Sequence, residues 1–224
     1  MECRTVNALW LGASLLSLAL PSFAGDIAGN VVVSKRLTKQ TVKPADYTLR
    51  GATAPSGETR FSEFDRMVVM LEGGKPASRA PEMVVLEQHN GRFEPELVVV
   101  PVGSIVQFPN EDPIFHNVFS LSRAKAFDLG FYPKGQTRSV KFDHEGIVQV
   151  YCHIHASMYA AIVVTSSPYV KPSADGSFSW TNLPAGHYRV VVWHKVAGKY
   201  ASEVDVPDSG RAEVTVRVPV DALP

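Results

Sequence analysis

The chain has 224 residues with 22 basic and 22 acidic side chains, and its 45% of hydrophobic and 20% of charged residues exclude a disordered or fibrous protein. The formal net charge is zero and no basic cluster stands out, so there is no electrostatic reason to expect nucleic acid or an anionic membrane surface as a partner. Two cysteines are too few for a disulfide framework.

The first 24 residues have the pattern of a secretory signal peptide. Arg4 provides a positive start, residues 8–20 are apolar, and Ser22-Phe23-Ala24 is a small-x-small cleavage site. A transmembrane anchor is the alternative, but the apolar stretch is shorter than the ~20 residues that a spanning helix needs. We therefore predict export to the periplasm, with no membrane span in the mature chain. Cleavage would leave Cys152 as the only cysteine.

Beyond the signal peptide the sequence predicts strands rather than helices. The candidate strands are short and β-rich, and Gly, Pro, Asn and Asp separate them. In chain order they span residues 29–33, 67–71, 83–86, 96–100, 105–108, 147–151, 160–164, 188–193 and 212–218. This pattern indicates an all-β sandwich architecture.

The predicted strands fall into three blocks. Residues 83–165 are dense in strands, whereas residues 25–82 and 166–224 each offer too few strands to bury both faces of a sandwich. If they pair with each other, the two outer blocks together have enough strands to form a sandwich. We therefore predict that residues 83–165 form one β-sandwich domain, inserted into a second β-domain that is built from both ends of the chain.

A group of metal-binding residue types lies at the end of the middle block. Cys152, His155 and Met158 have Cys-x-x-His-x-x-Met spacing between two predicted strands. Upstream, His116 follows a turn rich in Pro and Asn. A thiolate, two imidazoles and a thioether are the ligand set of a type 1 (blue) copper site. Each residue type alone is common in a core or on a surface, but the combination in an exported chain with one cysteine favours copper.

These features resemble those of the cupredoxins. Residues 83–165 are similar to an amicyanin-like or plastocyanin-like member of that family, and the chain as a whole resembles plastocyanin-like proteins that carry a methylamine utilization label. The matching segments are residues 93–100, 103–110, 116–118 and 146–152. The resemblance implies a Greek-key β-sandwich with one copper ion, whose ligands would be His116, Cys152, His155 and Met158. It also implies that Asn117 ties the two ligand-bearing segments together from outside the ligand set.

The outer blocks resemble the transthyretin-like or carboxypeptidase regulatory-like β-sandwich. The matching motifs are Gly29-Asn30-Val31, the apolar strand 68–71, Asp175-Gly176-Ser177-Phe178 and Leu183-Pro184-Ala185-Gly186-His187-Tyr188. These motifs contain no catalytic residues. The resemblance therefore implies a scaffold or docking module.

Electron transfer in the periplasm is the function that we expect from this set of features. A transient redox partner protein would meet an apolar surface around the exposed edge of His155, to which Phe115 and Tyr159 would contribute. An enzyme, such as a copper oxidase or nitrite reductase, would need a further copper site, and the sequence offers no second set of three histidines. We therefore do not expect an enzyme. Copper handling, or a copper sensor without a carrier role, remains the alternative because its ligands would be identical.

The remaining histidines carry weaker signals. Strand alternation would turn His153 away from the metal if Cys152 faces inward, so we expect an exposed side chain. A second, weaker metal site or a contact with a redox partner is the other interpretation of His153. The histidines without ligand spacing are expected to be structural or exposed; they are His89, His144, His187 and His194.

Overall fold

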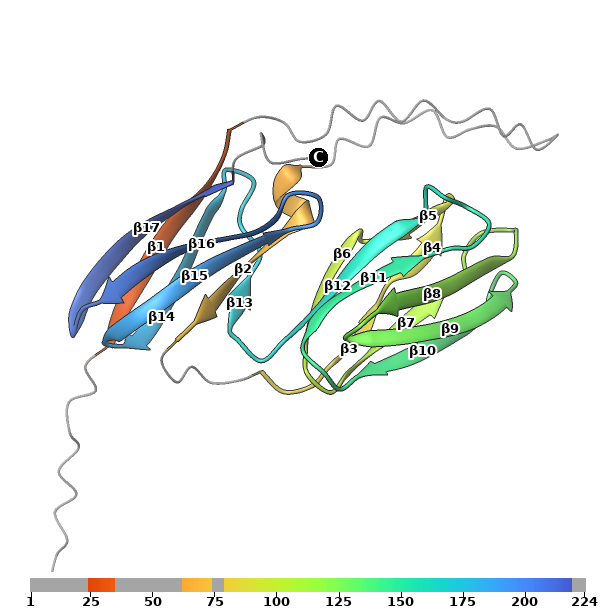
Figure 1. Ribbon diagram of the computed structural model, residues 1–224, viewed down its shortest axis with the longest axis horizontal. Coiled ribbons are helices and arrows are strands. Elements are labelled where there is room, and N and C mark those ends of the chain that lie inside the picture. The colour runs from red at the N-terminus through yellow and green to blue at the C-terminus, as the bar shows by residue number, and fades with distance from the viewer. Residues whose placement is uncertain (1–23, 35–61, 74–78, 219–224) are drawn as a thin grey trace, which may run out of the picture.

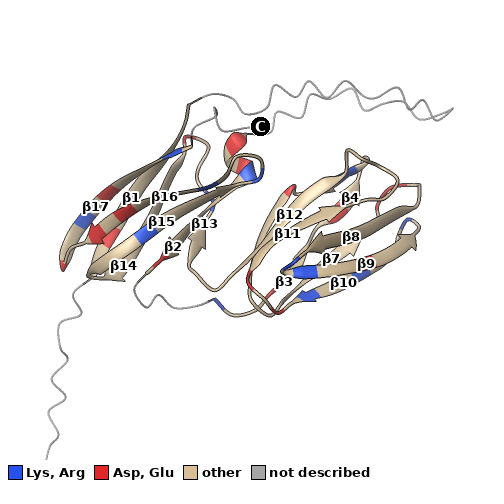
Figure 2. Ribbon diagram, viewed as in Figure 1, with Lys and Arg blue, Asp and Glu red and all other residues tan. Residues whose placement is uncertain are grey.

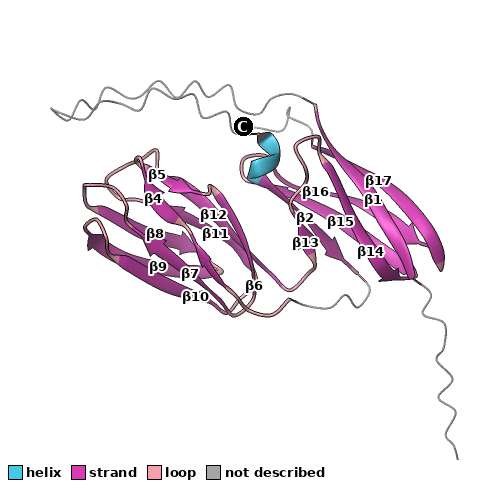
Figure 3. Ribbon diagram, turned by 180° about the vertical axis from the view of Figure 1, so that it is seen from behind, coloured by secondary structure: helices cyan, strands magenta, loops and turns pink. Residues whose placement is uncertain are grey.

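The computed structural model describes residues 24–34, 62–73 and 79–218. Nearly all of the regular structure within these ranges is strand, and the one described helix is the short 3-10 turn η1 (Glu63–Arg66), which is cyan in Figure 3. The prediction of an all-β architecture is confirmed. No helix of the described residues has the length and apolarity needed to cross a bilayer. The predicted signal peptide lies outside the described residues except for Ala24, the first residue of the first strand.

The strands form two bodies that lie side by side (Figure 1). The first body combines a five-stranded sheet in the order β6-β12-β11-β8-β9, a three-stranded sheet in the order β10-β7-β3 and the hairpin β4-β5. All of its strands come from the middle of the chain. They are β3 (Met83–Val85), β4 (Glu87–His89), β5 (Arg92–Glu94), β6 (Leu97–Pro101), β7 (Ser104–Pro109), β8 (His116–Ser122), β9 (Lys125–Tyr132), β10 (Thr137–Phe142), β11 (Gly146–Tyr151) and β12 (Tyr159–Thr165).

The second body is built from both ends of the chain. Its two sheets have the orders β14-β1-β17 and β13-β2-β15-β16, so that β1 and β2 pair with strands that lie more than a hundred residues further along. The division into an inserted domain and a host domain, and the transthyretin-like character of the host, stay predictions. The strands are β1 (Ala24–Val33), β2 (Met67–Glu72), β13 (Tyr169–Val170), β14 (Ser177–Pro184), β15 (Gly186–His194), β16 (Gly198–Val206) and β17 (Ser209–Val218).

Four strands are buried on both faces, and this explains their continuous apolar sequences. In β12, Ala160 and Ile162 point into the core of the first body, whereas Ala161 and Val163 point outward. Strands β6, β2 and β15 divide their side chains in the same way. The outward-pointing side chains meet in a third apolar cluster between the two bodies. Its members are Val68, Met70, Leu97, Val99, Ala161, Val163, Tyr169, Val191 and Trp193.

The sequence did not predict several strands that have one polar face. In β10, Val140 and Phe142 are buried while the residues between and before them are exposed or half-buried. In β16 most of the side chains remain at least partly exposed, and burial is confined to the end of the strand. Such strands lack the apolar runs on which the sequence prediction relied, because only one face of each meets a core.

Charged side chains of both signs are interspersed on the part of the sheet with β15 and β16 that the third apolar cluster leaves exposed (Figure 2). Glu72 of β2 accepts hydrogen bonds from Arg189 of the neighbouring β15 and from Lys199 of β16. Glu203 lies 3.4 Å from Arg189 on the other side. This face is a mixed-charge surface rather than a region of one sign.

Candidate metal centre

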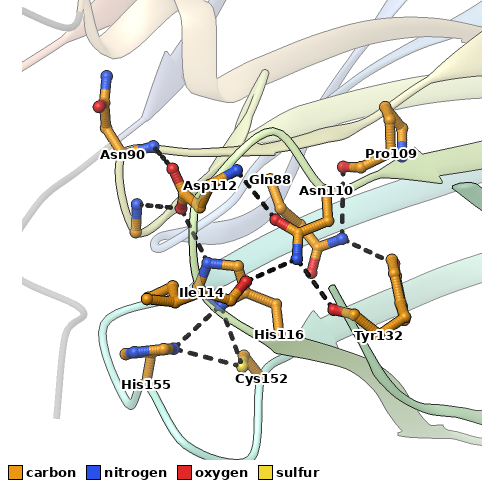
Figure 4. Close-up of polar contacts among 11 residues, drawn as sticks. Gln88, Asn90, Pro109, Asn110, Asp112, Ile114, His116, Tyr132, Cys152 and His155 are labelled. Carbon is orange, nitrogen blue, oxygen red and sulfur yellow. Dashed lines mark hydrogen bonds and ion pairs between the residues drawn. The ribbon is translucent and has the colours of Figure 1, made fainter. Parts of the chain in front are cut away.

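Three of the four predicted ligand residues bring their donor atoms together at one end of the first body (Figure 4). His116 Nδ1 lies 3.0 Å from His155 Nδ1, and Cys152 Sγ lies 3.9 and 3.7 Å from these two nitrogens. Within the described ranges, these three residues are the group of His, Cys, Asp and Glu side chains whose donor atoms lie close enough together to bind one metal ion.

The size of this triangle fits a metal ion. The three distances place a point in the plane of the donor atoms about 2 Å from both nitrogens and about 2.2 Å from the sulfur, close to the usual metal–imidazole length of about 2.0 Å and metal–thiolate length of about 2.3 Å. A trigonal His₂Cys set is the equatorial arrangement of a blue-copper site. The donor set and its spacing therefore fit copper without any rearrangement of the three side chains.

The fourth predicted ligand, Met158, lies in the same core cluster as Cys152. Its side chain is 1% exposed, and its backbone N–H donates to the His155 carbonyl oxygen at 3.0 Å, which closes the loop between β11 and β12. Cys152 follows directly after β11, and Met158 directly precedes β12. The antiparallel pairing of these two strands thus fixes both ends of the ligand loop.

A carboxylate holds the ring of His116 from the side opposite the metal-binding nitrogen. His116 Nε2 lies 2.8 Å from Asp112 Oδ2, and both side chains are buried. With the carboxylate accepting the Nε2–H, the lone pair of Nδ1 faces Cys152 and His155, which fixes the tautomer that a metal ligand needs. The sequence prediction did not include Asp112.

Asp112 is itself held by the turn of the hairpin β4-β5. The backbone N–H groups of Asn90 and Gly91 donate to its two carboxylate oxygens at 2.7 and 2.8 Å. Both turn residues have positive φ, as a two-residue hairpin turn of this type requires. Burial raises the pKa of Asp112, but these N–H groups and the His116 imidazole outweigh burial, and the pKa lies below its usual range. The sequence analysis did not predict this hairpin, although an Asn-Gly pair between two short strands is a signal that could have identified it.

The buried side chain of Asn110 fixes the turn that leads to His116. Its Nδ2 donates to the carbonyl oxygens of Ile114 and Tyr132, both at 2.9 Å, while its Oδ1 accepts from the Asp112 N–H (Figure 4). One amide therefore joins the turn to the end of β9. The Pro- and Asn-rich turn noted in the sequence is a rigid support for the first ligand.

The environment of Cys152 favours the thiolate. Burial alone would raise the pKa of its thiol, but the polar contacts of the sulfur with the His116 ring, with the backbone N–H groups of Asn117 and Ile154, and with the His155 ring lower this pKa to about 6. The thiolate is the form that binds metals. Burial lowers the pKa of the His116 imidazole, but the hydrogen bonds and charges of Cys152 and Asp112 outweigh burial and raise this pKa above its ordinary value.

Asn117 contacts β9 through its side chain and the ligand loop through its backbone. Its side-chain amide donates to Asp128 on β9 at 2.7 Å, while its backbone N–H is the group that approaches Cys152. Asp128 Oδ2 also lies 3.4 Å from His153 Nε2. The connection between the strand of His116 and the ligand loop thus passes through the Asn117 backbone and through Asp128.

His153 is exposed, as strand alternation predicts. Its ring stacks on Phe119 with the centroids 3.8 Å apart and the planes nearly parallel. Asp128 lies at one edge of the ring. Of the other histidines, His194 is fully buried and His187 pairs with Asp205 on the exposed face of β15 and β16.

Apolar side chains are exposed on the segments that carry the ligands. Ile154 is 54% exposed beside the half-buried His155, and Phe115, next to His116, is 55% exposed. Ile114 is exposed to a lesser degree. Tyr159, the other predicted contributor, is half-buried and stacks on Tyr151.

The chain matches no protein-family model and no curated protein sequence. Among solved structures, an amicyanin mutant in its Cu(I) form has 23% identity and a TM-score of 0.35, and the match covers 37% of this chain and 82% of that one. A Cu-containing nitrite reductase from Thermus scotoductus SA-01 has 24% identity and a TM-score of 0.35, with 42% of this chain and 24% of that one covered. A purple cupredoxin from Nitrosopumilus maritimus has 22% identity and a TM-score of 0.33, with 37% and 98% covered.

Proposed function

We propose that this protein is an exported type 1 copper protein that transfers electrons in the periplasm. Its one copper ion would be bound by His116, Cys152 and His155, with Met158 as a long axial ligand. Bound copper supplies the Cu(I)/Cu(II) couple. The protein would act as a carrier between redox partner proteins rather than as an enzyme, and the second β-body would serve as scaffold.

The observation that carries this proposal is the triangle of one sulfur and two Nδ1 atoms around a common point at bonding distance. Sulfur stabilises Cu(I), whereas imidazole suits both oxidation states. A site with this mixed set suits a metal that changes oxidation state in place. Hard cations such as Mg²⁺ and Ca²⁺ prefer oxygen ligands, so a site with one sulfur and two nitrogen donors does not suit them.

The supports of the ligands favour a carrier over a transport or storage protein. Asp112 orients His116, Asn110 fixes the preceding turn, and the β11–β12 pair fixes the ends of the ligand loop. A site that is already shaped for the metal needs little rearrangement when the oxidation state changes. The exposed Phe115 and Ile154 provide apolar surface next to the ligands for a small, transient contact.

The experiment is a spectrum of the copper-loaded protein. We expect an intense sulfur-to-copper charge-transfer band that Cys152→Ser abolishes, with reversible one-electron cycling in a voltammogram. A colourless copper-loaded wild type would contradict the proposal. A coloured protein that gives up copper readily to a mild chelator, and that no redox partner reduces or oxidises, would favour copper handling instead.

A further inference from the structure

The second body contacts the ligand loop through one buried lysine. Lys195 follows directly after β15, and its side chain is 6% exposed. Its Nζ donates to the backbone carbonyl oxygen of Tyr159 at 2.8 Å and lies 4.2 Å from the centroid of the Tyr159 ring. Tyr159 is the residue after Met158. The hydrogen bond therefore joins the second body to the end of the loop that carries the axial ligand.

Lys195 is held in place by a carboxylate of the first body and a backbone carbonyl group of the second. Its Nζ lies 3.0 Å from Glu96 Oε2, next to the start of β6, and the same carboxylate lies 3.0 Å from Nε of Arg66. The Lys195 backbone N–H also donates to the Arg66 carbonyl oxygen at 2.9 Å. Burial lowers the pKa of Lys195, while Glu96 acts in the opposite direction. A cation in this position is fixed at both its backbone and its side chain.

Lys195, Glu96 and Arg66 place charges beside the apolar interface between the two bodies. The third apolar cluster would hold the two bodies together through side chains such as Val163 and Trp193 alone. Charged groups are costly to bury beside such a surface, and replacing them with apolar residues is often neutral for stability. A buried ammonium that donates to the backbone next to Met158 therefore points to a role other than general adhesion.

We infer that Lys195 is a positioning residue for the axial end of the metal site, acting from the second body through the Tyr159 carbonyl group. An axial thioether bond to copper is long and weak, so the position of the sulfur depends on the backbone that carries it. The Met158 backbone N–H donates to the His155 carbonyl oxygen, and Lys195 fixes the carbonyl group of the following residue, Tyr159. The spectroscopic consequences of this inference rest on the proposed copper function.

The test replaces Lys195 by methionine, which keeps the length of the side chain and removes its charge and donors. We expect Lys195→Met to change the position or relative intensity of the charge-transfer bands, to shift the reduction potential, and to speed copper release to a chelator by about threefold to tenfold. In metal-free protein, hydrogen exchange at the Met158 amide should become faster.

Two control variants separate positioning from other effects. Lys171→Met removes another lysine of the second body, whose Nζ donates to the Leu97 carbonyl oxygen rather than to Tyr159, and Tyr169→Phe removes a hydrogen bond across the interface to the Val99 carbonyl oxygen. Both should leave the charge-transfer bands and the Met158 amide exchange unchanged. If either control reproduces the effects of Lys195→Met, or if Lys195→Met has none, the inference is wrong.

A double variant covers the case in which Lys195→Met does not fold. Lys195→Met combined with Glu96→Gln removes both members of the ion pair, and the Gln side chain keeps an oxygen that can accept from Arg66, which would otherwise lose this acceptor. The double variant should show the same spectral shift and faster Met158 exchange. A wild type without a charge-transfer band would refute the copper function, and the exchange measurement on metal-free protein would then decide the role of Lys195 separately.

Discussion

Asp112 and His116 form the contact that prepares the first ligand for a metal: Oδ2 of the carboxylate lies 2.8 Å from Nε2 of the imidazole, and both groups are buried. The imidazole therefore presents Nδ1 to Cys152 and His155. Since the carboxylate is anchored by backbone N–H groups of the β4-β5 hairpin, the orientation of one ligand depends on a turn about 25 residues earlier in the chain.

Asp112→Asn should weaken copper binding by about 10-fold to 100-fold, because an amide cannot match the carboxylate as an acceptor for the imidazole and for the two backbone N–H groups. The measurement is a competition titration against a chelator of known affinity. Glu111→Gln removes a neighbouring carboxylate that is exposed, and it should leave the affinity unchanged. Equal affinities for Asp112→Asn and wild type would show that this carboxylate does not support the ligand.

Replacing His153 and replacing His155 by alanine should have opposite effects on the charge-transfer colour. His155→Ala should remove the charge-transfer colour, because Nδ1 of this ring is one corner of the donor triangle. His153→Ala should retain it, because the His153 ring stacks on Phe119 away from the donors. Absorption spectra of both variants after copper loading check the assignment. If only His153→Ala loses the colour, then His153 rather than His155 is the ligand.

Buried His194 should make stability depend on pH. Its Nδ1 accepts from the backbone N–H groups of Val196 and Ala197, and its Nε2 faces Glu63 at 3.3 Å. Burial lowers the pKa of His194 below the ordinary 6.5, more than Glu63 raises it, and nearby Arg66 acts in the same direction as burial. The unfolded chain therefore takes up a proton first as pH falls. Stability should be complete above pH 6.5 and be lost as pH falls from there towards the folded-state pKa.

The measurement is the free energy of unfolding of metal-free Cys152→Ser protein between neutral and mildly acidic pH, so that metal binding and the ligand thiol play no part. Each unit of difference between folded and unfolded pKa corresponds to about 1.4 kcal/mol. His194→Asn, whose amide oxygen can accept the same backbone N–H groups, should flatten this part of the curve. An identical pH profile for both proteins would contradict the prediction.

Deleting residues 83–165 and joining the ends with a short linker tests the predicted insertion. The remaining β1, β2 and β13–β17 contain both sheets and the core of the second body, so we expect a folded β-domain. The deletion also uncovers apolar side chains of β2 and β15, among them Val191 and Trp193, and should therefore cause self-association. Replacing Val191 and Trp193 by threonine should restore a monomer in sedimentation experiments. Independent folding of either outer block would show the insertion model to be wrong.

The sequence contained enough information to predict the candidate ligand residues and the strand-rich character of the chain. Cys152, His155 and Met158 lie within seven residues, and their spacing is a local property that folding does not alter. Strands buried on both faces, such as β12, were visible as continuous apolar runs. Strands with one polar face, such as β10, were missed because alternation with charged residues also occurs in loops and edges.

The tertiary structure alone decided what supports those ligands. Asp112 reaches His116 only because a hairpin turn binds the carboxylate, and Lys195 reaches Tyr159 across 36 residues and between two bodies. Single acidic and basic residues are common on every protein surface, so their sequence positions carry no sign of such contacts. The spacing of residues along a strand determines which face of the sheet each side chain points to. Which residue it meets on that face depends on the pairing of strands that are far apart in the sequence.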